Sequence, residues 1–269
     1  MVSCEILGPG PDNLGLGNQL FCVAATLGYA FKHNLDFCFP QLQEELYKPY
    51  AKTIFHNLTA YTGSSHNPSN LFQEAANSST VYTEIPPLKN VKLEGFFQSY
   101  KYFAQAWERI RPLLTLPPKK INDIRQEHQH LLPNSGPLVA VHVRRGDYVS
   151  RYARKFQDLS DSYYPKAFEH FTNSKFIIFS DDIKWCKKYF KNCGHSLVFA
   201  ETNCEITDLY LMSQATHNII ANSTFSWWGA YLNPNPDKTI IAPKKWFGEV
   251  RSSRNNQLND LFPPSWILI

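Results

Sequence analysis

The chain has 269 residues, 43% of them hydrophobic and 14% aromatic, so it can bury the core of one large domain or two small ones. Its formal net charge of +4 comes from scattered basic and acidic residues, which disfavours a nucleic-acid partner and favours a local anionic ligand. The sequence contains no apolar stretch of the roughly 18 residues that a membrane span needs. The six cysteines form no CxxC pair, which favours free thiols, although disulfides remain open.

Strand and helix patterns alternate from the start of the chain, because short apolar runs are separated by segments of helical periodicity. Residues 41–79 interrupt this order with Ser, Asn, His and Pro, and they predict a mobile insertion. The other elements predicted in this half are strands over 2–7, 35–39, 81–85 and 91–96, and helices over 18–33, 100–114 and 119–132.

Pro133–Pro137 is the strongest interruption in the chain, and it predicts a boundary between domains at 1–133 and 138–269. The second domain repeats strand and helix regularly, which indicates a doubly wound parallel sheet with ligands bound beyond the carboxyl ends of its strands. Its predicted elements are strands over 138–143, 176–179, 197–200, 218–221 and 239–242, and helices over 164–171, 183–190, 205–214 and 225–232.

The first of these strand ends carries His142, Arg144, Arg145 and Asp147. Because alternate side chains of a strand share a face, His142 and Arg144 should point one way and Arg145 the other. The guanidinium fork matches phosphate oxygens, so Arg144 is a candidate diphosphate ligand, and Arg145 can pair with Asp147 or a neighbouring carboxylate. The alternative is that both arginines are surface residues.

The second strand end carries Asp181 and Asp182 ahead of a predicted helix. Asp182 is expected to cap that helix, because an Asp side chain accepts hydrogen bonds from the first helical amides. Asp181 is then free to bind the neighbouring N–H donors of a guanine base.

The third strand end is a hydroxyl-rich turn that contains Ser223 and Thr224 and leads into a helix. The amides of a helix start together with such hydroxyls form an anion site suited to a phosphate. The alternative is an ordinary N-cap, and Trp227 and Trp228 are expected to be core aromatics.

In the first domain, Gly15 and Gly17 lie between a strand and a helix, where glycine permits close approach of a ligand to the backbone. Position 20 is Leu, so the GxGxxG dinucleotide fingerprint fails. The sequence also lacks GxSxG, HExxH and any metal-ligand spacing, and no metal cofactor is expected.

Taken together, five segments resemble glycosyltransferase family 11, the α-1,2-fucosyltransferases, within a wider set that shares the His-x-Arg-Arg-x-Asp signature. The opening at 8–13 is longer than the compact glycine turn typical of bacterial members. The segments that carry the resemblance are Gly17–Phe21, Glu94–Ser99 with Tyr102–Phe103, Val141–Asp147, Phe179–Asp181 and Ser223–Trp228.

The resemblance implies an α/β fold of GT-B type, with two doubly wound domains that face each other across a cleft and with the nucleotide held mainly by the second. It gives Arg144 the role of binding the diphosphate and stabilising the departing GDP, with Asn18 and His142 as further catalytic candidates. The implied donor-binding residues are Gly17, Asn18, His142, Arg144, Asp181, Ser223, Thr224 and Phe225, and Gln98 is the acceptor-side candidate.

The implied reaction is inverting, metal-independent transfer of L-fucose from GDP-fucose to an oligosaccharide or glycoconjugate, with the 2-hydroxyl of a terminal β-galactoside as the expected acceptor. GDP-fucose is then a co-substrate, and no cofactor is expected. The alternatives are protein O-fucosylation, α-1,6 fucosyl transfer, and a non-catalytic glycan- or nucleotide-binding protein. The family implies a cytoplasmic location if the chain is complete and the Golgi lumen if it is a trimmed catalytic domain.

Overall fold

The computed structural model describes residues 1–4, 15–44, 48–63, 67–75, 80–133, 136–160 and 162–269. The chain divides into two compact units. The N-terminal unit consists of Met1–Asp123 and Gln257–Pro263, and the C-terminal unit consists of Ile124–Asn256 and Pro264–Ile269. Both units contain a parallel β-sheet, which the regular alternation of strands and helices predicted for the second.

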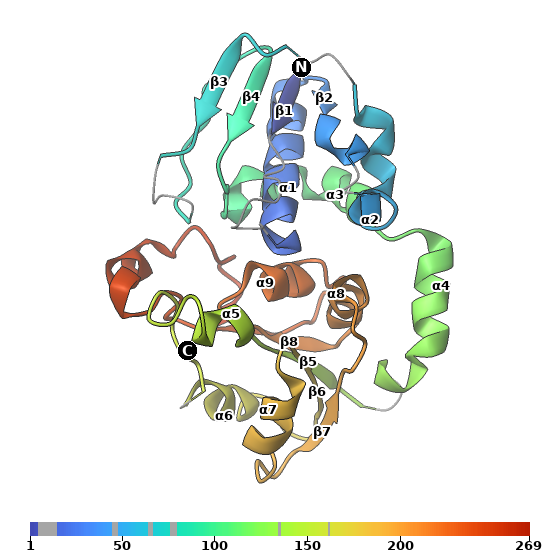
Figure 1. The fold of residues 1–269 in the computed structure, drawn as a ribbon, viewed down its shortest axis with the longest axis vertical. Coiled ribbons are helices and arrows are strands. Elements are labelled where there is room, and N and C mark those ends of the chain that lie inside the picture. Colours follow the sequence, from blue (N-terminus) through green and yellow to red (C-terminus); the bar gives the residue numbers. More distant parts are fainter. Residues whose placement is uncertain (5–14, 45–47, 64–66, 76–79, 134–135, 161) are drawn as a thin grey trace. The chain divides into compact units, whose positions relative to one another are not determined.

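The N-terminal unit is built on a four-stranded parallel sheet in the order β2-β1-β4-β3, with α1 (Leu16–His33) packed along β1 (Figure 1). The predicted helix over 18–33 is confirmed. The helix ends where Asn34 adopts a left-handed conformation, which a short polar side chain tolerates. The strands are β1 (Val2–Cys4), β2 (Phe37–Cys38), β3 (Asn70–Gln73) and β4 (Val91–Glu94), and the predicted extension of the first strand to residue 7 lies outside the described residues.

Residues 41–79, predicted to be a mobile insertion, contain regular elements in their described part. β3 pairs in parallel with β4, and it is preceded by α2 (Lys48–Ala51) and a 3₁₀ helix over His56–Tyr61. β3 is an edge strand with the exposed Leu71, so it lacks the apolar alternation that identifies a half-buried strand.

The strand predicted over 81–85 is absent, because the backbone there bonds to side chains instead of a neighbouring strand. The Tyr82 amide donates to Asp260 Oδ2 at 2.9 Å, and the Thr83 amide donates to the Tyr102 hydroxyl at 3.0 Å. These contacts satisfy the backbone groups that a sheet would otherwise pair.

The helix predicted over 100–114 is divided into short pieces. Three 3₁₀ segments, Tyr100–Tyr102, Ala104–Ala106 and Arg111–Leu114, flank α3 (Trp107–Ile110). The backbone of the first break lies against α1 at Gly28, where an added Cβ would stand 2.2 Å from the Tyr102 carbonyl oxygen. The close approach of these two backbones therefore requires glycine at position 28.

The C-terminal unit contains a six-stranded sheet in the order β10-β9-β8-β5-β6-β7, and its pairs are parallel. The five strands predicted here are confirmed to within a few residues. The sixth is two residues long and was missed, because it is too short to show a pattern. The strands are β5 (Leu138–Val143), β6 (Lys175–Ser180), β7 (Ser196–Phe199), β8 (His217–Ile219), β9 (Ile240–Ala242) and β10 (Ile267–Leu268).

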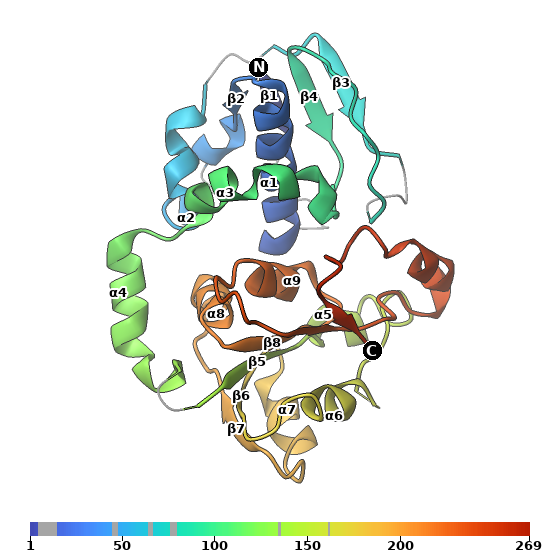
Figure 2. The same ribbon diagram turned by 180° about the vertical axis from the view of Figure 1, so that it is seen from behind.

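The sheet of the C-terminal unit reverses its order between β5 and β8. From β5 the chain adds β6 and β7 on one side, and then β8, β9 and β10 on the other. Figures 1 and 2 show α6 and α7 on one face of the sheet and α8 and α9 on the opposite face. In such sheets ligands bind at this reversal, beyond the carboxyl ends of the strands. The helices are α6 (Tyr163–Phe168), α7 (Ile183–Tyr189), α8 (Glu205–Ser213) and α9 (Thr224–Tyr231).

The alternation of β5 decides which side chains face the site. Val139, Val141 and Val143 lie in the buried core together with residues of α6 such as Phe168. His142 therefore points to the other face, where its ring centroid lies 5.6 Å from that of Phe225 in α9.

The division into units differs from the predicted boundary in two places. It falls within α4 (Pro118–Glu127), ahead of Pro133, and the last part of that helix contacts the C-terminal unit, where the Arg125 guanidinium donates to the Tyr210 hydroxyl of α8 at 2.7 Å. In addition, residues 257–263 belong to the N-terminal unit. Residues 134 and 135 of the predicted linker lie outside the described part.

Candidate active site

Arg144 directly follows β5, where two carboxylates hold its guanidinium group. Nη2 lies 2.7 Å from Asp147 Oδ1, and Nη1 lies 3.1 Å from Asp181 Oδ2. The side chain is one-third exposed, so it is accessible to a ligand. Asp147 reaches it from α5 (Gly146–Val149), and Asp181 reaches it from the end of β6. We call Arg144, Arg145, Asp147, Asp181 and Asp182 the arginine cluster.

Asp181, which the sequence predicts to be available to a guanine base, contacts two groups of the protein. Its Oδ1 accepts a hydrogen bond from the Arg145 amide at 2.9 Å, and its Oδ2 faces Arg144. Both of its oxygens already contact the loop that follows β5.

Arg145 turns to the other side, as the strand alternation predicted. Its guanidinium lies 3.8 Å from the ring centroid of Trp185, and Nε lies 3.5 Å from Asp182 Oδ2. Arg145 therefore pairs with Asp182, and Asp147 pairs with Arg144. Asp182 also caps α7, since its Oδ1 accepts from the Trp185 amide at 3.1 Å, and this predicted cap is confirmed.

His142 is buried beside this cluster, with 5% of its surface exposed. Its Nδ1 has no hydrogen-bond partner. Burial, together with the nearby Arg144 charge, lowers the pKa of His142 from 6.5 to about 3. The imidazole is therefore neutral at physiological pH, and it can offer a ligand a hydrogen bond but no positive charge.

The turn after β8 brings Ser223, Thr224 and Phe225 to the start of α9. Ser223 has the extended conformation of an N-cap residue, yet its side chain makes no capping hydrogen bond. Ser223 thus holds the N-cap position that the alternative predicted, but without a capping bond from its side chain. The first amides of a helix lack acceptors within the helix, so this turn presents N–H donors. Trp227 and Trp228 are fully buried, as predicted.

Tyr148 connects the two strand ends, and sequence reasoning missed it. Its hydroxyl donates to the Asn222 carbonyl at 3.1 Å, and the Arg144 guanidinium lies 5.5 Å from its ring centroid. The ring also stacks on Phe156, with centroids 4.0 Å apart and an interplanar angle of 5°. An aromatic residue two positions after a glycine is too common a pattern to signal this role.

In the N-terminal unit, two candidate residues meet at the start of α1. The Gln98 Nε2 donates to the Asn18 Oδ1 at 2.9 Å, although the two lie far apart in the sequence. This bond directs the Asn18 oxygen to Gln98 and leaves its amide N–H groups as the donors. Gly17 precedes Asn18 in the first turn of α1 and is buried.

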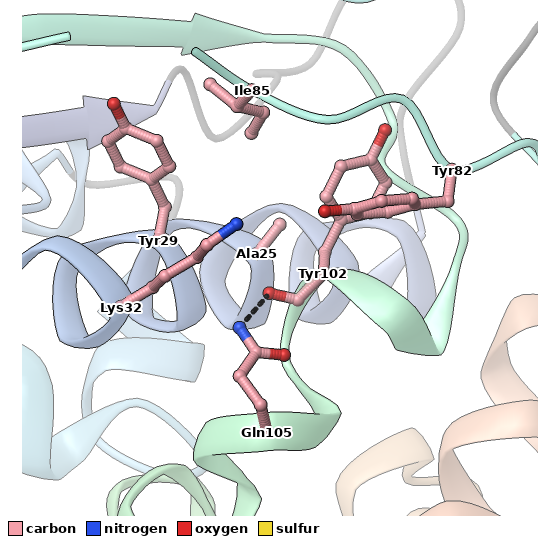
Figure 3. Close-up of a pocket in the computed structure, with 7 residues that line it drawn as sticks. All are labelled: Ala25, Tyr29, Lys32, Tyr82, Ile85, Tyr102 and Gln105. Atoms are coloured by element: carbon pink, nitrogen blue, oxygen red, sulfur yellow. Dashed lines mark hydrogen bonds between the residues drawn. The ribbon is translucent and has the colours of Figure 1, made fainter. Parts of the chain in front are cut away.

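A separate small hollow lies in the N-terminal unit, and none of the candidate residues lines it (Figure 3). Its polar groups are largely used within the fold: Gln105 donates to the Tyr102 carbonyl at 3.3 Å, and Lys32 pairs with Glu84 at 2.9 Å. The hollow is lined by Ala25, Tyr29, Lys32, Tyr82, Ile85, Tyr102 and Gln105.

The described residues contain no group of three or more His, Cys, Asp or Glu side chains placed to bind a metal ion. None of the helices in that part of the chain has the length and apolar character needed to span a membrane. The six cysteines are free, and four of them are buried.

The sequence profile of glycosyl transferase family 11 matches residues 15–269. The chain belongs to this family. The resemblance in the sequence is thereby confirmed, and the match includes both the arginine cluster and the pair formed by Asn18 and Gln98.

Glycosyltransferases of bacteria and mammals resemble the chain in sequence. An α-1,2-colitosyltransferase of Escherichia coli is 38% identical over 67% of this chain, and the O-antigen biosynthesis glycosyltransferase WbnK of the same organism is 33% identical over 67%. A galactoside α-(1,2)-fucosyltransferase of mouse is 32% identical over 53%. These alignments span 63%, 64% and 41% of the relatives' own lengths, so the chain matches less than two thirds of each.

Solved structures support the fold. The NodZ α-1,6-fucosyltransferase soaked with GDP-fucose superposes with a TM-score of 0.54 at 12% identity, covering 85% of this chain and 90% of that one. FUT1 of Arabidopsis thaliana in complex with GDP gives a TM-score of 0.51 at 12% identity, covering 97% and 74%. The α/β fold of GT-B type, with parallel sheets, is thus confirmed.

Proposed function

We propose that the chain transfers L-fucose from GDP-fucose to a glycan hydroxyl, with the 2-hydroxyl of a terminal β-galactoside as the preferred acceptor. The observation that carries this proposal is the position of Arg144. Two carboxylates hold it beyond the carboxyl end of β5, at the reversal of the sheet. The names of the α-1,2-fucosyltransferase relatives and the GDP-fucose in the NodZ structure support the choice of donor and linkage.

In this proposal the residues at the strand ends hold the nucleotide. Arg144 contacts the diphosphate, and the amides at Thr224 and Phe225 add N–H donors at the start of α9. His142 is neutral and contributes a hydrogen bond near the nucleoside. Asn18 places its amide N–H groups beside the fucose, and Gln98 holds Asn18 in that orientation.

The reaction is one direct displacement. The bond between the anomeric carbon and the β-phosphate oxygen breaks, and a bond to the acceptor oxygen forms on the opposite face, which turns a β-linked donor into an α product. The electron pair of the broken bond stays on the β-phosphate of GDP, and the proton of the acceptor hydroxyl is released. Arg144 stabilises the negative charge that grows on the phosphate as the bond breaks.

We further propose that this reaction needs no metal ion, because Arg144 and the helix-start amides supply the stabilisation that a divalent cation provides elsewhere. Turnover should therefore persist in excess EDTA. Loss of turnover on chelation, with recovery on addition of Mn²⁺ or Mg²⁺, would overturn this part of the proposal.

GDP-colitose should be compared with GDP-fucose as a donor, since a relative with 38% identity is named a colitosyltransferase. Colitose lacks one ring hydroxyl of fucose, so the two GDP-sugars share the diphosphate and differ at a single polar group. A site that hydrogen-bonds this hydroxyl discriminates strongly against the sugar that lacks it.

The test is incubation of the purified chain with GDP-fucose or GDP-colitose and a panel of β-galactosides. GDP release and the linkage of the product, determined by NMR, are the measurements. An α-1,2-fucosylated galactoside is the expected product. Preference for GDP-colitose would change the donor, an α-1,6 or protein-linked product would change the acceptor, and GDP binding without transfer to any acceptor would make the chain a binding protein.

A further inference from the structure

We propose that Asp181 is a positioning residue, which holds Arg144 ready for the diphosphate and does not read the guanine base. This inference rests on the proposed function, because it takes Arg144 to be the diphosphate ligand. The partner of Asp181 is then Arg144, whereas its place at a strand end suggested a guanine base.

The contacts of Asp181 provide the first argument. One carboxylate oxygen accepts from the Arg145 amide at 2.9 Å, and the other lies 3.1 Å from Arg144 Nη1. Asp181 thus binds the backbone of the loop after β5 and the side chain that the loop presents. The β5 and β6 strands pair in register up to Val143 and Ser180, so the two groups leave the sheet side by side.

Gly146 provides the second argument, because it lets the carboxylate approach the loop. A Cβ at this position would stand 2.5 Å from Asp181 Oδ2, which is closer than real Cβ contacts. The backbone of Gly146 does not have a positive φ, so conformational freedom does not explain the glycine there. The space around the Asp181 carboxylate does explain it.

The charges provide the third argument. The arginine cluster combines two guanidinium groups with three carboxylates, and Arg144 is held through both terminal nitrogens. An arginine has five N–H donors, so the remaining ones are available to phosphate oxygens. A guanidinium fixed before the ligand arrives needs no reorganisation as charge develops on the phosphate.

Two substitutions disturb this contact in different ways. Asp181→Asn keeps the shape but places an amide N–H₂ group against either Arg144 or the Arg145 amide. Gly146→Ala keeps every charge and displaces the carboxylate by steric contact. Each should lower kcat by up to about 100-fold, the order expected when a catalytic group is misplaced by about 1 Å. Gly63→Ala is the matched control, since a Cβ there meets only Cys38 at 4.0 Å.

A base contact and a positioning role are separated by the choice of nucleotide. GDP and inosine diphosphate differ only by the 2-amino group, which a guanine-binding carboxylate would contact. We expect Asp181→Asn to leave the ratio of their affinities, measured by calorimetry, unchanged. In an Arg144→Lys background, Asp181→Asn should lower kcat by no more than about twofold further, because its effect acts through Arg144.

The outcomes distinguish this inference from the proposed function. If Asp181→Asn abolished the preference for GDP over inosine diphosphate while kcat stayed near that of the wild type, the positioning role alone would be overturned. Full activity of Gly146→Ala in a protein with an unchanged melting temperature would overturn it also. Failure of the wild-type chain to bind GDP would instead refute the proposed function on which it rests.

Discussion

In the C-terminal unit the residues around Arg144 are charged and bound to one another, whereas in the N-terminal unit the candidate residues are neutral. Arg144 is held between Asp147 and Asp181, while Asn18 and Gln98 share a single amide hydrogen bond. The charged region suits a diphosphate, since an Arg contact to phosphate combines charge with fixed geometry. The neutral region suits sugar hydroxyls, which need donors and acceptors but no charge.

The two regions should also respond differently to substitution. Removing one member of a partly buried charged network leaves the charge of its partner uncompensated. The resulting loss of free energy is larger than that of a single hydrogen bond. A neutral hydrogen bond contributes about 0.5–1.5 kcal/mol. The substitutions below test this difference, starting from the largest expected effect.

The strongest test compares the two adjacent arginines. Arg144→Lys keeps the charge but loses the planar fork, so turnover should fall by about 100- to 1,000-fold, or about 2.7–4 kcal/mol, in a folded protein. Arg145→Lys should lower the melting temperature through lost contacts with Trp185 and retain a measurable rate. Steady-state kinetics and thermal unfolding of both variants are the measurements. Near-full activity of Arg144→Lys, together with an inactive but folded Arg145→Lys, would show that Arg145 and not Arg144 is the diphosphate ligand.

The buried His142 makes the charged region sensitive to acid. Its pKa is lowered from 6.5 to about 3, so between these values the unfolded chain binds a proton that the folded chain does not. The contribution of the neutral imidazole to the free energy of unfolding is complete above pH 6.5 and is lost as the pH falls toward 3. About 2 kcal/mol of this contribution is lost between pH 6.5 and 4.5. Urea unfolding at these two pH values should show a smaller loss for His142→Gln, and equal losses for both proteins would contradict the burial of a neutral imidazole.

Substitutions of Asp182 test whether every carboxylate of the arginine cluster contributes to turnover. Asp182→Ala removes the cap of α7 and should cost about 0.5–2 kcal/mol of unfolding free energy while turnover stays near that of the wild type. Asp182→Asn serves as the control, because Asn caps helices comparably and loses only the ion pair with Arg145. A large loss of kcat in Asp182→Ala at a temperature where the protein is folded would show that this carboxylate is part of the catalytic machinery.

The neutral region should give the smallest effect. Gln98→Ala removes one hydrogen bond from Asn18 and should cost about 0.5–1.5 kcal/mol, roughly 2- to 12-fold in kcat/KM. Asn18→Ala should cost more, since it removes the donors themselves. Kinetics with GDP-fucose measure both, and a greater loss for Gln98→Ala than for Asn18→Ala would indicate that Gln98 contacts a substrate directly.

Much of the C-terminal unit could be predicted because β5, β6 and β9 are buried on both faces. Apolar runs such as Leu138–Val143 are typical of buried strands, and the alternation of strands with helices indicates that the sheet is parallel. The polar ends of these strands then identified the candidate site. The ion-pair partners of these polar residues could not be predicted, because sequence spacing does not say whether Asp147 reaches Arg144 or Arg145.

The N-terminal unit was harder to predict, because its short elements depend on contacts from distant segments. β3 exists as an edge strand because β4 lies beside it, and residues 81–85 avoid a strand because Asp260 and Tyr102 bind their amides. The bond between Gln98 and Asn18 likewise joins two segments that nothing local connects.

The return of residues 257–263 to the N-terminal unit has a consequence for how the protein forms during translation. Ser99 Oγ donates to the Asp260 carbonyl at 2.6 Å, and Lys101 pairs with the Asp260 carboxylate. Chains usually fold from the N-terminus as they leave the ribosome. Here the first unit lacks part of itself until almost all of the second has been synthesised, so a nascent chain carries an incomplete first unit through most of its elongation.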